Sequence, residues 1–278
     1  MKVAIVILNF NGGYDTLECL SSLSQLITSD FDINQIVVDN ASTDHSVDLI
    51  RTGFPKVTLL VNNQNLGFSE GNNVGIRFAL NHGADFVLLL NNDTRLDKNC
   101  LIELVKTAHD QHKGGVFGPK IYFSSGSETH VSDYKTKDKG RVIWYAGGKI
   151  DWDNVLASHR GVDEVDTGQY NELVRTSFVS GCAMFVRRQV FEKVGLFDLK
   201  FFLYYEDVDF CQRARKRGFE LYYVPKAILW HKNAESAGGT GSELQSYYIT
   251  RNRLLIGMRY SPWKAKLALW REALKMLI

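Results

Sequence analysis

The sequence predicts an α/β fold with a mostly parallel central sheet and helices on both of its faces. From residue 3 to residue 112, apolar strand-like runs alternate with segments of helical spacing. The strand-like runs are almost continuously apolar, which is typical of strands that are covered on both faces. Regular alternation of strand and helix is typical of parallel sheets, because a crossover is needed before each new parallel strand.

Eight elements are expected in this first part of the chain. Strand and helix alternate, in order, over Val3–Asn9, Asp15–Leu26, Gln35–Asp39, Thr43–Arg51, Val57–Val61, Ser69–Asn81, Phe86–Leu90 and Lys98–His112. Ser42 is placed to cap the second of these helices, since its hydroxyl can accept a hydrogen bond from a free N–H of the first turn.

The regular alternation stops after Tyr122. Residues 124–141 and 151–173 are polar and lack periodicity, and we expect 124–141 to form a mobile loop that becomes ordered when a substrate binds. The elements expected in this second part are strands at Val142–Ala146, Arg175–Val179 and Leu221–Val224, the last ended by Pro225, and helices at Gln189–Val194 and Phe210–Arg217.

Nothing in the sequence resembles a linker between two independent domains. Residues 1–256 are therefore expected to form one domain, in which 123–256 continue the sheet begun by 1–122. Residues 257–278 are expected to add a C-terminal amphipathic helix, and the amphipathic pattern still continues at the last residue.

Composition argues against several classes of protein. A net charge of +2 provides no strong field for nucleic acid. No run of about 18 apolar residues is present, so no transmembrane helix is expected. The four cysteines form no CxxC pair, which argues against a zinc site or a disulfide framework and favours a cytoplasmic setting. The apolar N-terminal stretch is too short for a signal peptide and reads as the first strand.

Small hydrogen-bonding residues follow each of the first four strands. For a single cluster a turn is the simpler explanation, because Asn and Asp favour turns. Open α/β sheets bind their ligands beyond the carboxyl ends of the strands, so four clusters together favour a ligand cleft. The clusters are Asn9 to Gly12, Asp39 to Ser42, Asn62 and Asn63 with Asn65 to Gly67, and Asn91 to Asp93.

The clusters suggest a nucleoside diphosphate rather than a dinucleotide. Neither a GxGxxG fingerprint nor a GxxxxGK[ST] loop is present. Asp39 is placed to accept a hydrogen bond from a base or ribose. Asp93 could hold a hard divalent cation, which commonly bridges protein carboxylates and substrate phosphates.

Six segments, in order, resemble glycosyltransferase family 2, and the closest likeness is to the rhamnosyltransferase-like branch that builds bacterial cell-surface polysaccharide. The similarity runs from Lys2 to about Ile256, and the third segment occupies the place of the family's DxD motif. The segments are VVDNASTDHS (37–46), NQNLGFSEGNNVGI (63–76), LLLNNDT (88–94), 178–219, VPKAILWH (224–231) and YYITRNRLLI (247–256).

The resemblance implies a GT-A fold and inverting transfer of a sugar from a nucleoside diphosphate sugar, dTDP- or UDP-linked, to a saccharide acceptor. In this reading Asp39 contacts the pyrimidine, while Asp93 and His231 hold Mg²⁺ or Mn²⁺. Asn91 stands where the family commonly has its first Asp, which leaves Asp93 with more of the metal binding. The full set of donor-binding candidates is Asn9, Asn11, Asp39, Asn40, Asn65, Gly67, Asn72, Asn91, Asn92 and Arg251.

Simpler structural explanations exist for His231, for Arg251 and for the acidic pair Glu206 and Asp207. A lone histidine such as His231 is more often structural, and two arginines on a helix, here Arg251 and Arg253, usually form a solvated face. The position of His231 at a strand end, and of Arg251 in an Arg-Asn pair, matches the family's metal and diphosphate contacts. Glu206 and Asp207 could simply be the acidic start of a helix, since acids favour helix N-termini.

Asp207 is the candidate general base. The segment YYEDVDF is rich in aromatic residues, and a carboxylate among aromatic rings can have the raised pKa that suits a base. By resemblance, Asp207 takes the proton of the acceptor hydroxyl, and Glu206 and Tyr205 line the acceptor side.

The C-terminal segment is expected to touch a membrane surface. Trp263, Leu267, Trp270, Leu274 and Leu277 recur at helical spacing, and basic residues flank this stripe. The alternative is a helix packed on the domain, but two tryptophans with basic flanks favour an interfacial helix. By resemblance the acceptor is lipid-linked and lies at the cytoplasmic leaflet. The basic residues are Lys264, Arg271 and Lys275 on one flank and Lys266 on the other.

Two other functions and the oligomeric state stay open at this point. A sugar-nucleotide nucleotidyltransferase would be expected to carry a basic Gly-rich loop after the first strand, and NFNGGYDT has no basic residue. A non-catalytic sugar-nucleotide binding module would not need a base such as Asp207. The sequence decides neither the donor sugar nor whether the chain forms a homodimer.

Overall fold

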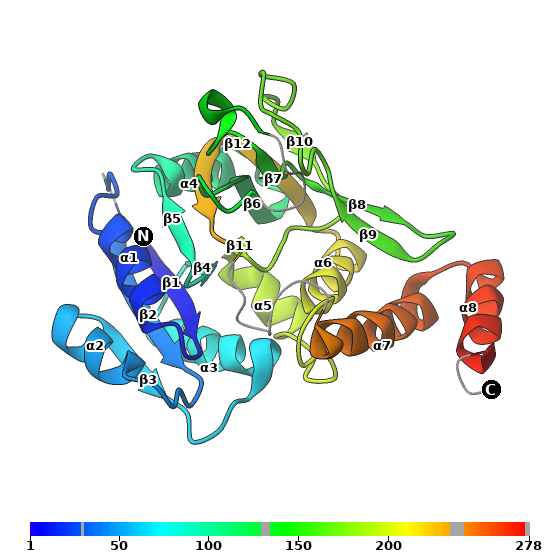
Figure 1. Cartoon of the computed structure of the whole chain (residues 1–278), viewed down its shortest axis with the longest axis horizontal. Helices are drawn as coiled ribbons and strands as arrows, with labels where there is room; N and C mark the ends of the chain where they lie inside the picture. Colours follow the sequence, from blue (N-terminus) through cyan, green and yellow to red (C-terminus); the bar gives the residue numbers. More distant parts are fainter. Residues whose placement is uncertain (29–30, 129–133, 234–241, 276–278) are drawn as a thin grey trace.

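The computed structural model describes residues 1–28, 31–128, 134–233 and 242–275, with only the backbone described for 273–275. Its sheet orders the strands β10-β12-β6-β11-β4-β1-β2-β3, with β5 beside β12 and β7 beside β6 (Figure 1). The predicted α/β class with a mostly parallel central sheet is confirmed, since β1 pairs in parallel with both β2 and β4, and β2 with β3. These four strands are β1 (Lys2–Asn9), β2 (Asp32–Asp39), β3 (Thr58–Val61) and β4 (Phe86–Asn91).

Six strands run in the same direction, including β6 at the end of the first half and β12 from the second half of the chain. The strand β11 (Ala183–Arg187) is antiparallel to both β4 and β6, so β6 (Gly114–Phe123) points the same way as β4. The long strand β12 (Glu220–His231) then pairs in parallel with β6. The carboxyl ends of β1, β2, β3, β4, β6 and β12 therefore meet at one edge of the sheet.

The helices of the first half are α1 (Gly13–Leu23), α2 (Ser46–Gly53), α3 (Gly67–Asn81) and α4 (Cys100–Asp110). The helix α3 lies very close to the sheet. A Cβ on its Gly75 would come within 2.3 Å of the Val6 side chain, and one on Gly71 within 2.6 Å of Leu8. Glycine at both positions therefore permits the close approach of helix and strand.

The second half adds α5 (Arg188–Val194), α6 (Glu206–Lys216), α7 (Glu243–Tyr260) and α8 (Trp263–Lys275). In Figure 1, α7 extends away from the sheet and α8 crosses its far end. The remaining elements are β5 (Thr94–Leu96), the short helix η1 (Thr136–Asp138), β7 (Ile143–Tyr145), β8 (Gly148–Asp151), β9 (Leu156–His159) and β10 (Val174–Arg175).

Four local predictions were wrong. Ser42 does not cap α2; its hydroxyl donates to Asp39 instead, and α2 starts only at Ser46. Pro225 does not end the last strand, because β12 shifts register between Val224 and Ile228 and continues to His231. Prolines are tolerated in strands at such irregularities. The expected strand Arg175–Val179 is reduced to the two residues of β10.

The fourth error concerns residues 151–173, which read as structureless. They contain β9, which pairs with β8 as a two-stranded hairpin. The polar stretch 124–141 contains η1, and its residues 129–133 lie outside the described residues, so its ordering by substrate stays a prediction. The expected helix Phe210–Arg217 begins earlier, at Glu206, which places Glu206 and Asp207 in the first turn of α6.

Candidate active site

Asp93 and His231 meet at the carboxyl edge of the sheet. Asp93 lies between β4 and β5, and β5 pairs with the end of β12, where Thr94 is opposite His231. Nε2 of His231 lies 3.1 Å from Oδ1 of Asp93, and both side chains are buried. The backbone N–H of Lys232 also donates to the carbonyl of Asp93, at 2.9 Å. Two residues 138 positions apart in sequence thus form one polar pair because their strands end at the same edge.

The environment of His231 favours its protonated form. Burial disfavours the imidazolium, but Cys182 and Asp93 beside the ring raise the pKa of His231 well above its ordinary value. The ring is also in edge contact with Trp144, with centroids 4.6 Å apart. A cation bound here would have to displace this proton, so binding would weaken as the pH falls.

The donor set of this pair fits a divalent cation that is shared with a substrate. Nδ1 of the buried His231 has no hydrogen-bond partner among the described residues. One carboxylate and one imidazole are ligands that Mn²⁺ accepts, but two ligands do not complete a coordination shell. No group of three or more His, Cys, Asp or Glu ligands occurs in the described part of the chain. The remaining ligands would have to come from the substrate or water.

The end of β1 and the end of β2 are joined by a buried network around Asp39. Its carboxylate accepts hydrogen bonds from Nδ2 of Asn9 at 2.7 Å, from the Ser42 hydroxyl at 2.7 Å and from the Ser42 backbone N–H at 2.9 Å. The side chain has no exposed surface. A contact between Asp39 and a base would therefore require the side chain of Asn9 or Ser42 to move.

Two further candidates, Asn11 and Asn92, complete the wall near β1. Asn11 has a positive φ of 51° and its Oδ1 accepts from the backbone N–H of Thr43. Nδ2 of Asn92 lies 3.2 Å from each of three acceptors, which are Oδ1 of Asn9, the Gly12 carbonyl and the Thr16 hydroxyl. Asn11 thus connects the loop after β1 to the loop after β2, and Asn92 connects the loop after β4 to the end of β1 and the start of α1.

Asn40 and Asn65 shape the loop that follows β3. Nδ2 of Asn40 donates to Oδ1 of Asn65 and to the Gly67 carbonyl, and its Oδ1 accepts from Nδ2 of Asn62 and the N–H of Leu66. All the hydrogen-bonding capacity of Asn40 is thereby used within the protein. These hydrogen bonds of Asn40 hold the loop in place, and a contact between Asn40 and the donor stays a prediction.

Gly67 and Asn72 belong to the start of α3. Gly67 has a φ of 74°, and a Cβ there would come within 2.4 Å of the Phe202 ring, so no other residue fits without rearrangement. Asn72 is buried and its Nδ2 donates to the carbonyl of Phe68, one turn earlier. Asn91, the last residue of β4, is only partly buried.

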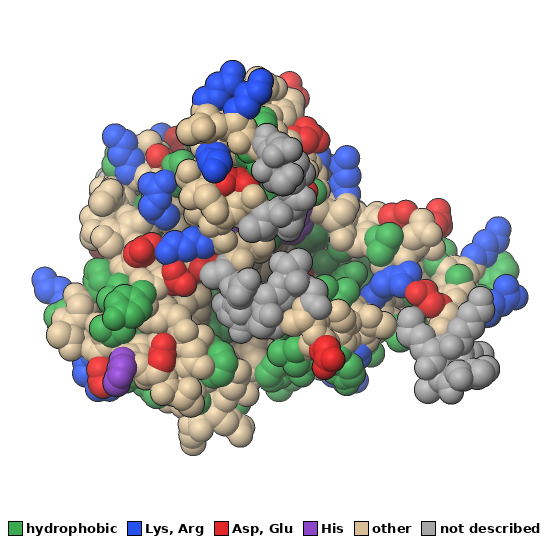
Figure 2. Space-filling view, viewed as in Figure 1, with side chains coloured by type: hydrophobic (Ala, Val, Ile, Leu, Met, Phe, Trp, Pro, Cys, Tyr) green, Lys and Arg blue, Asp and Glu red, His purple; other side chains and the backbone are tan. Residues whose placement is uncertain are grey.

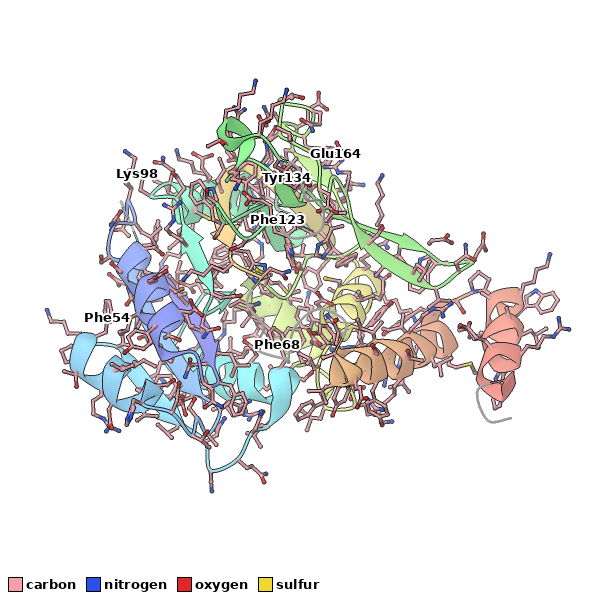
Figure 3. All side chains as sticks on the ribbon, viewed as in Figure 1. Phe54, Phe68, Lys98, Phe123, Tyr134 and Glu164 are labelled. Atoms are coloured by element: carbon pink, nitrogen blue, oxygen red, sulfur yellow. The ribbon has the colours of Figure 1, made fainter. Side chains whose placement is uncertain are left out.

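The start of α3 also contacts the segment that leads into α6. The N–H of Phe68 donates to the Phe202 carbonyl at 2.7 Å, and the Ser69 hydroxyl donates to the Phe201 carbonyl. Phe68, labelled in Figure 3, lies where the start of α3 meets the second half of the chain. The two halves of the domain therefore meet directly beside the loops after the strands.

Asp207 and Glu206 occupy the first turn of α6 in different environments. Asp207 accepts hydrogen bonds from the N–H of Gly181 at 2.9 Å and of Val208 at 2.7 Å, and burial raises its pKa. Glu206 is buried, and its Oε2 has no hydrogen-bond partner among the described residues. Burial, with a further contribution from Asp207, raises the pKa of Glu206 well above its ordinary value.

A short chain of contacts connects Asp207 with the metal candidates. Asp207 accepts from the N–H of Gly181, and the carbonyl of the next residue, Cys182, accepts from the N–H of Asn91 at 2.9 Å. Cys182 also lies beside His231. This chain connects the predicted base to the sheet edge that carries the predicted metal ligands.

The backbone just before Asp207 is strained. Tyr204 and Tyr205 both have a φ of 67°, the left-handed region that non-glycine residues seldom adopt. Such residues cost about 1–3 kcal/mol each and persist only where surrounding contacts hold them. The contact comes from Asn252 of α7, whose Nδ2 donates to the carbonyls of Leu203 and Tyr204 at 2.7 and 2.8 Å.

Asn252 was missed by the sequence analysis, which singled out its neighbour Arg251. Nη1 of Arg251 donates to the carbonyl of Lys200 and to Oδ1 of Asn252, both at 2.8 Å. Only one of the guanidinium nitrogens is engaged in these bonds, so a diphosphate contact by Arg251 stays a prediction. The available signal was an asparagine inside a long helix, where asparagine is a poor helix former.

Two surface cavities among the described residues, of about 450 and 360 Å³, lie away from this site. The first involves Ile33 and Gln35 in the early part of β2, and the second involves Met1 and Phe86, beside the amino ends of β1 and β4. Because α/β sheets bind ligands at the carboxyl ends of their strands, we place the active site at the edge that carries Asp93 and His231.

Comparison with known proteins identifies the family. The model of the glycosyltransferase-like family 2 matches residues 2–254. An N-acetylglucosaminyl-diphospho-decaprenol L-rhamnosyltransferase of Mycobacterium tuberculosis is 26% identical over 98% of this chain and 87% of its own length. A dTDP-rhamnosyl transferase of Shigella flexneri is 25% identical over 85% of this chain and 75% of its own.

Solved structures support the fold. GalNAc-T7, solved with UDP, GalNAc and Mn²⁺, matches 88% of this chain at a TM-score of 0.64 and 17% identity, and the match spans 47% of its own chain. A mannosyltransferase of Pyrobaculum calidifontis, solved with GDP-Man and Mn²⁺, matches 98% of this chain and 68% of its own at a TM-score of 0.58 and 15% identity.

Proposed function

Because this chain belongs to the glycosyltransferase-like family 2 and is a glycosyltransferase, we propose that it transfers a sugar from a pyrimidine nucleoside diphosphate sugar to a saccharide acceptor, with inversion. The observation that carries the proposal is the chain of contacts from Asp207 through Gly181 and Cys182 to Asn91, which joins a base to the edge with Asp93 and His231. The rhamnosyltransferase relatives support rhamnose as the sugar and dTDP as its carrier.

In this reaction Asp207 is the general base. It removes the proton from the acceptor hydroxyl while that oxygen attacks the anomeric carbon of the donor sugar. The N–H groups of Gly181 and Val208 fix the direction of the carboxylate. Its raised pKa suits the task, because a carboxylate with a higher pKa is a stronger base.

Asp93 and His231 are the residues that would hold Mg²⁺ or Mn²⁺. When bound, the cation neutralises the charge of the departing diphosphate. The fit rests on the donor set of a buried carboxylate and a buried imidazole, and the structures of two related folds solved with Mn²⁺ support it.

The donor nucleotide would lie along the loops after β1, β2 and β3. Asp39 is the proposed acceptor for the N3–H of the pyrimidine, once Asn9 or Ser42 yields one of its present hydrogen bonds. Arg251 is the proposed contact for the diphosphate, through the guanidinium nitrogens that do not bind Lys200 or Asn252.

The acceptor is proposed to be lipid-linked, for cell-surface polysaccharide synthesis, and α8 to rest on the inner face of the membrane. Trp263, Leu267 and Trp270 of α8 are 67%, 51% and 57% exposed, while Ala265 and Leu269 are buried. The relative that acts on a diphospho-decaprenol supports a lipid-linked acceptor. Among the described residues no helix is long and apolar enough to cross a membrane.

A thermal-shift screen tests donor class and metal together. Ligands that bind the native state raise its melting temperature, by an amount that grows with affinity. We expect dTDP-rhamnose or UDP-sugars to raise the melting temperature with Mn²⁺, but purine nucleotide sugars to have no effect. In Asp93→Ala the Mn²⁺-dependent part of the shift should vanish. An equal shift with Mn²⁺ and with excess EDTA would exclude the metal, and a purine preference would exclude the proposed donor.

A further inference from the structure

Asn252 is the residue that connects α7 to the backbone before the proposed base. The residue has no exposed surface, although it lies in the middle of a helix. Its Nδ2 donates to two consecutive carbonyls, those of Leu203 and Tyr204, which precede α6. Both hydrogens of the amide group are thereby used on this one segment.

The orientation of the Asn252 amide is itself fixed. Nη1 of Arg251 donates to Oδ1 of Asn252 at 2.8 Å and to the carbonyl of Lys200 at 2.8 Å. An oxygen that accepts from a guanidinium cannot exchange places with the NH₂ group. The donors of Asn252 therefore point permanently toward residues 203 and 204.

The segment that Asn252 holds would not keep its shape alone. Tyr204 and Tyr205 both have positive φ, and neither is a glycine. Tyr205 immediately precedes Glu206 and Asp207, the first two residues of α6. A change in φ at Tyr205 would rotate the start of the helix and, with it, the carboxylate of Asp207.

We propose that Asn252 is a positioning residue for Asp207, which it keeps in the productive orientation by holding the left-handed backbone of Tyr204 and Tyr205. The proposal rests on the function proposed above, in which Asp207 is the base. A displacement of a reacting group by about 1 Å can lower the rate about 10²-fold. Loss of the Asn252 donors should therefore reduce kcat rather than donor binding.

Two substitutions remove the amide donors in different ways. Asn252→Asp keeps the size and replaces the NH₂ by an acceptor, and Asn252→Ser is smaller and introduces no charge, so it covers the case in which the first variant does not fold. Met258→Ala, at an exposed position of the same helix, is the control. Each protein is measured for kcat, for donor KM, for Mn²⁺-dependent binding of the nucleoside diphosphate and for melting temperature.

We expect kcat of the folded Asn252 variants to fall about 10²-fold, with nucleoside diphosphate binding unchanged. In an Asp207→Asn background, Asn252→Ser should cause no further loss, because residues that act through one group are not additive. Wild-type kcat in Asn252→Ser would overturn the proposal, as would an equal loss in both backgrounds, which indicates a purely structural role. If Asp207→Asn alone turns over at the wild-type rate, it is the base assignment that fails first.

Discussion

Glu206 and Asp207 are adjacent in sequence but lie in different environments. Asp207 accepts two backbone N–H groups, whereas Oε2 of Glu206 is buried without a partner among the described residues. Burial opposes ionisation of both and backbone hydrogen bonds favour the charged form of both, but the neighbouring Asp207 further opposes ionisation of Glu206. Asp207 is therefore the better general base, and Glu206 is the group whose ionisation costs stability.

This difference predicts how Glu206→Gln changes stability with pH. The pKa of Glu206 in the folded state is raised well above its ordinary value of 4.5, so the folded state binds the proton more tightly than the unfolded state. The stability from this proton is complete below the ordinary value and is lost as pH rises through the raised value. Glutamine never ionises, so the variant should gain stability relative to wild type as pH rises, on the order of 1 kcal/mol.

Denaturant unfolding of wild type and Glu206→Gln at pH 4 and pH 8 measures this difference. The midpoint of Glu206→Gln minus the midpoint of wild type should be larger at pH 8 than at pH 4. Parallel stability curves across this range would show that Glu206 ionises in the folded state as readily as in the unfolded state.

The sequence predicted the individual site residues unevenly. Asp93, His231 and Asp207 were singled out through the family resemblance; the structure places Asp93 beside His231, and the three roles stay predictions. Asn40 was expected to bind the donor, but all its hydrogen bonds are made within the protein. The role of Asn252 could not be predicted from the sequence. It depends on positive φ at two tyrosines, and no sequence pattern indicates that conformation.

At the scale of the element, the direction of the strands decides which edge of the sheet carries the predicted site residues. The alternation of strands and helices was sufficient to predict β1 to β4 and their helices. The continuation of β12 past Pro225 was not predictable, because a register shift against β6 accommodates the proline. That continuation brings His231 level with Thr94, next to Asp93.

The helix α8 combines two faces that the sequence analysis treated as alternatives. Leu269 packs on α7, since a Cβ on Gly257 would come within 2.1 Å of its side chain. Trp263, Leu267 and Trp270 remain exposed. Figure 2 shows hydrophobic and basic side chains together at this end of the molecule. Leu274 and Leu277 of the expected stripe lie outside the described side chains.

We expect the protein to cosediment with anionic liposomes at low salt through this face. Replacing Trp263 and Trp270 by Ser should weaken binding, because the two rings supply most of the exposed apolar area of the stripe. Added salt should weaken it too, since it screens the attraction between basic residues and lipid headgroups. A control with Ser at the exposed Leu156 and Leu173 should bind as wild type does.

Retention of full liposome binding by the tryptophan variant would assign the contact to another surface. If the wild-type chain does not bind anionic liposomes at low salt, the proposed contact of α8 with a membrane is wrong. Neither outcome affects the proposed active site, because the described ion pair between α7 and α8, Arg253 with Glu272, involves none of the predicted site residues.

At the scale of the whole molecule, the proposed function assigns different tasks to the two halves of the chain. The first half presents the loops after β1 to β4, where the donor is proposed to bind. The second half supplies Asp207, and the contacts of Phe68 with Phe202 and of Asn91 with Cys182 join the halves. The single domain stays a prediction from the sequence, and the direction of β6 and β12 beside the first strands could be seen only in the structure.

The most direct test of this account compares nucleoside diphosphate release by wild type and Asp207→Asn, with saturating donor, acceptor and Mn²⁺. The substitution preserves shape and removes the proton acceptor, so donor binding should be unchanged while turnover falls about 10²–10⁴-fold. This result would separate donor binding in the first half from transfer by the second. Turnover at the wild-type rate in Asp207→Asn would contradict the assignment of the base and the mechanism built on it.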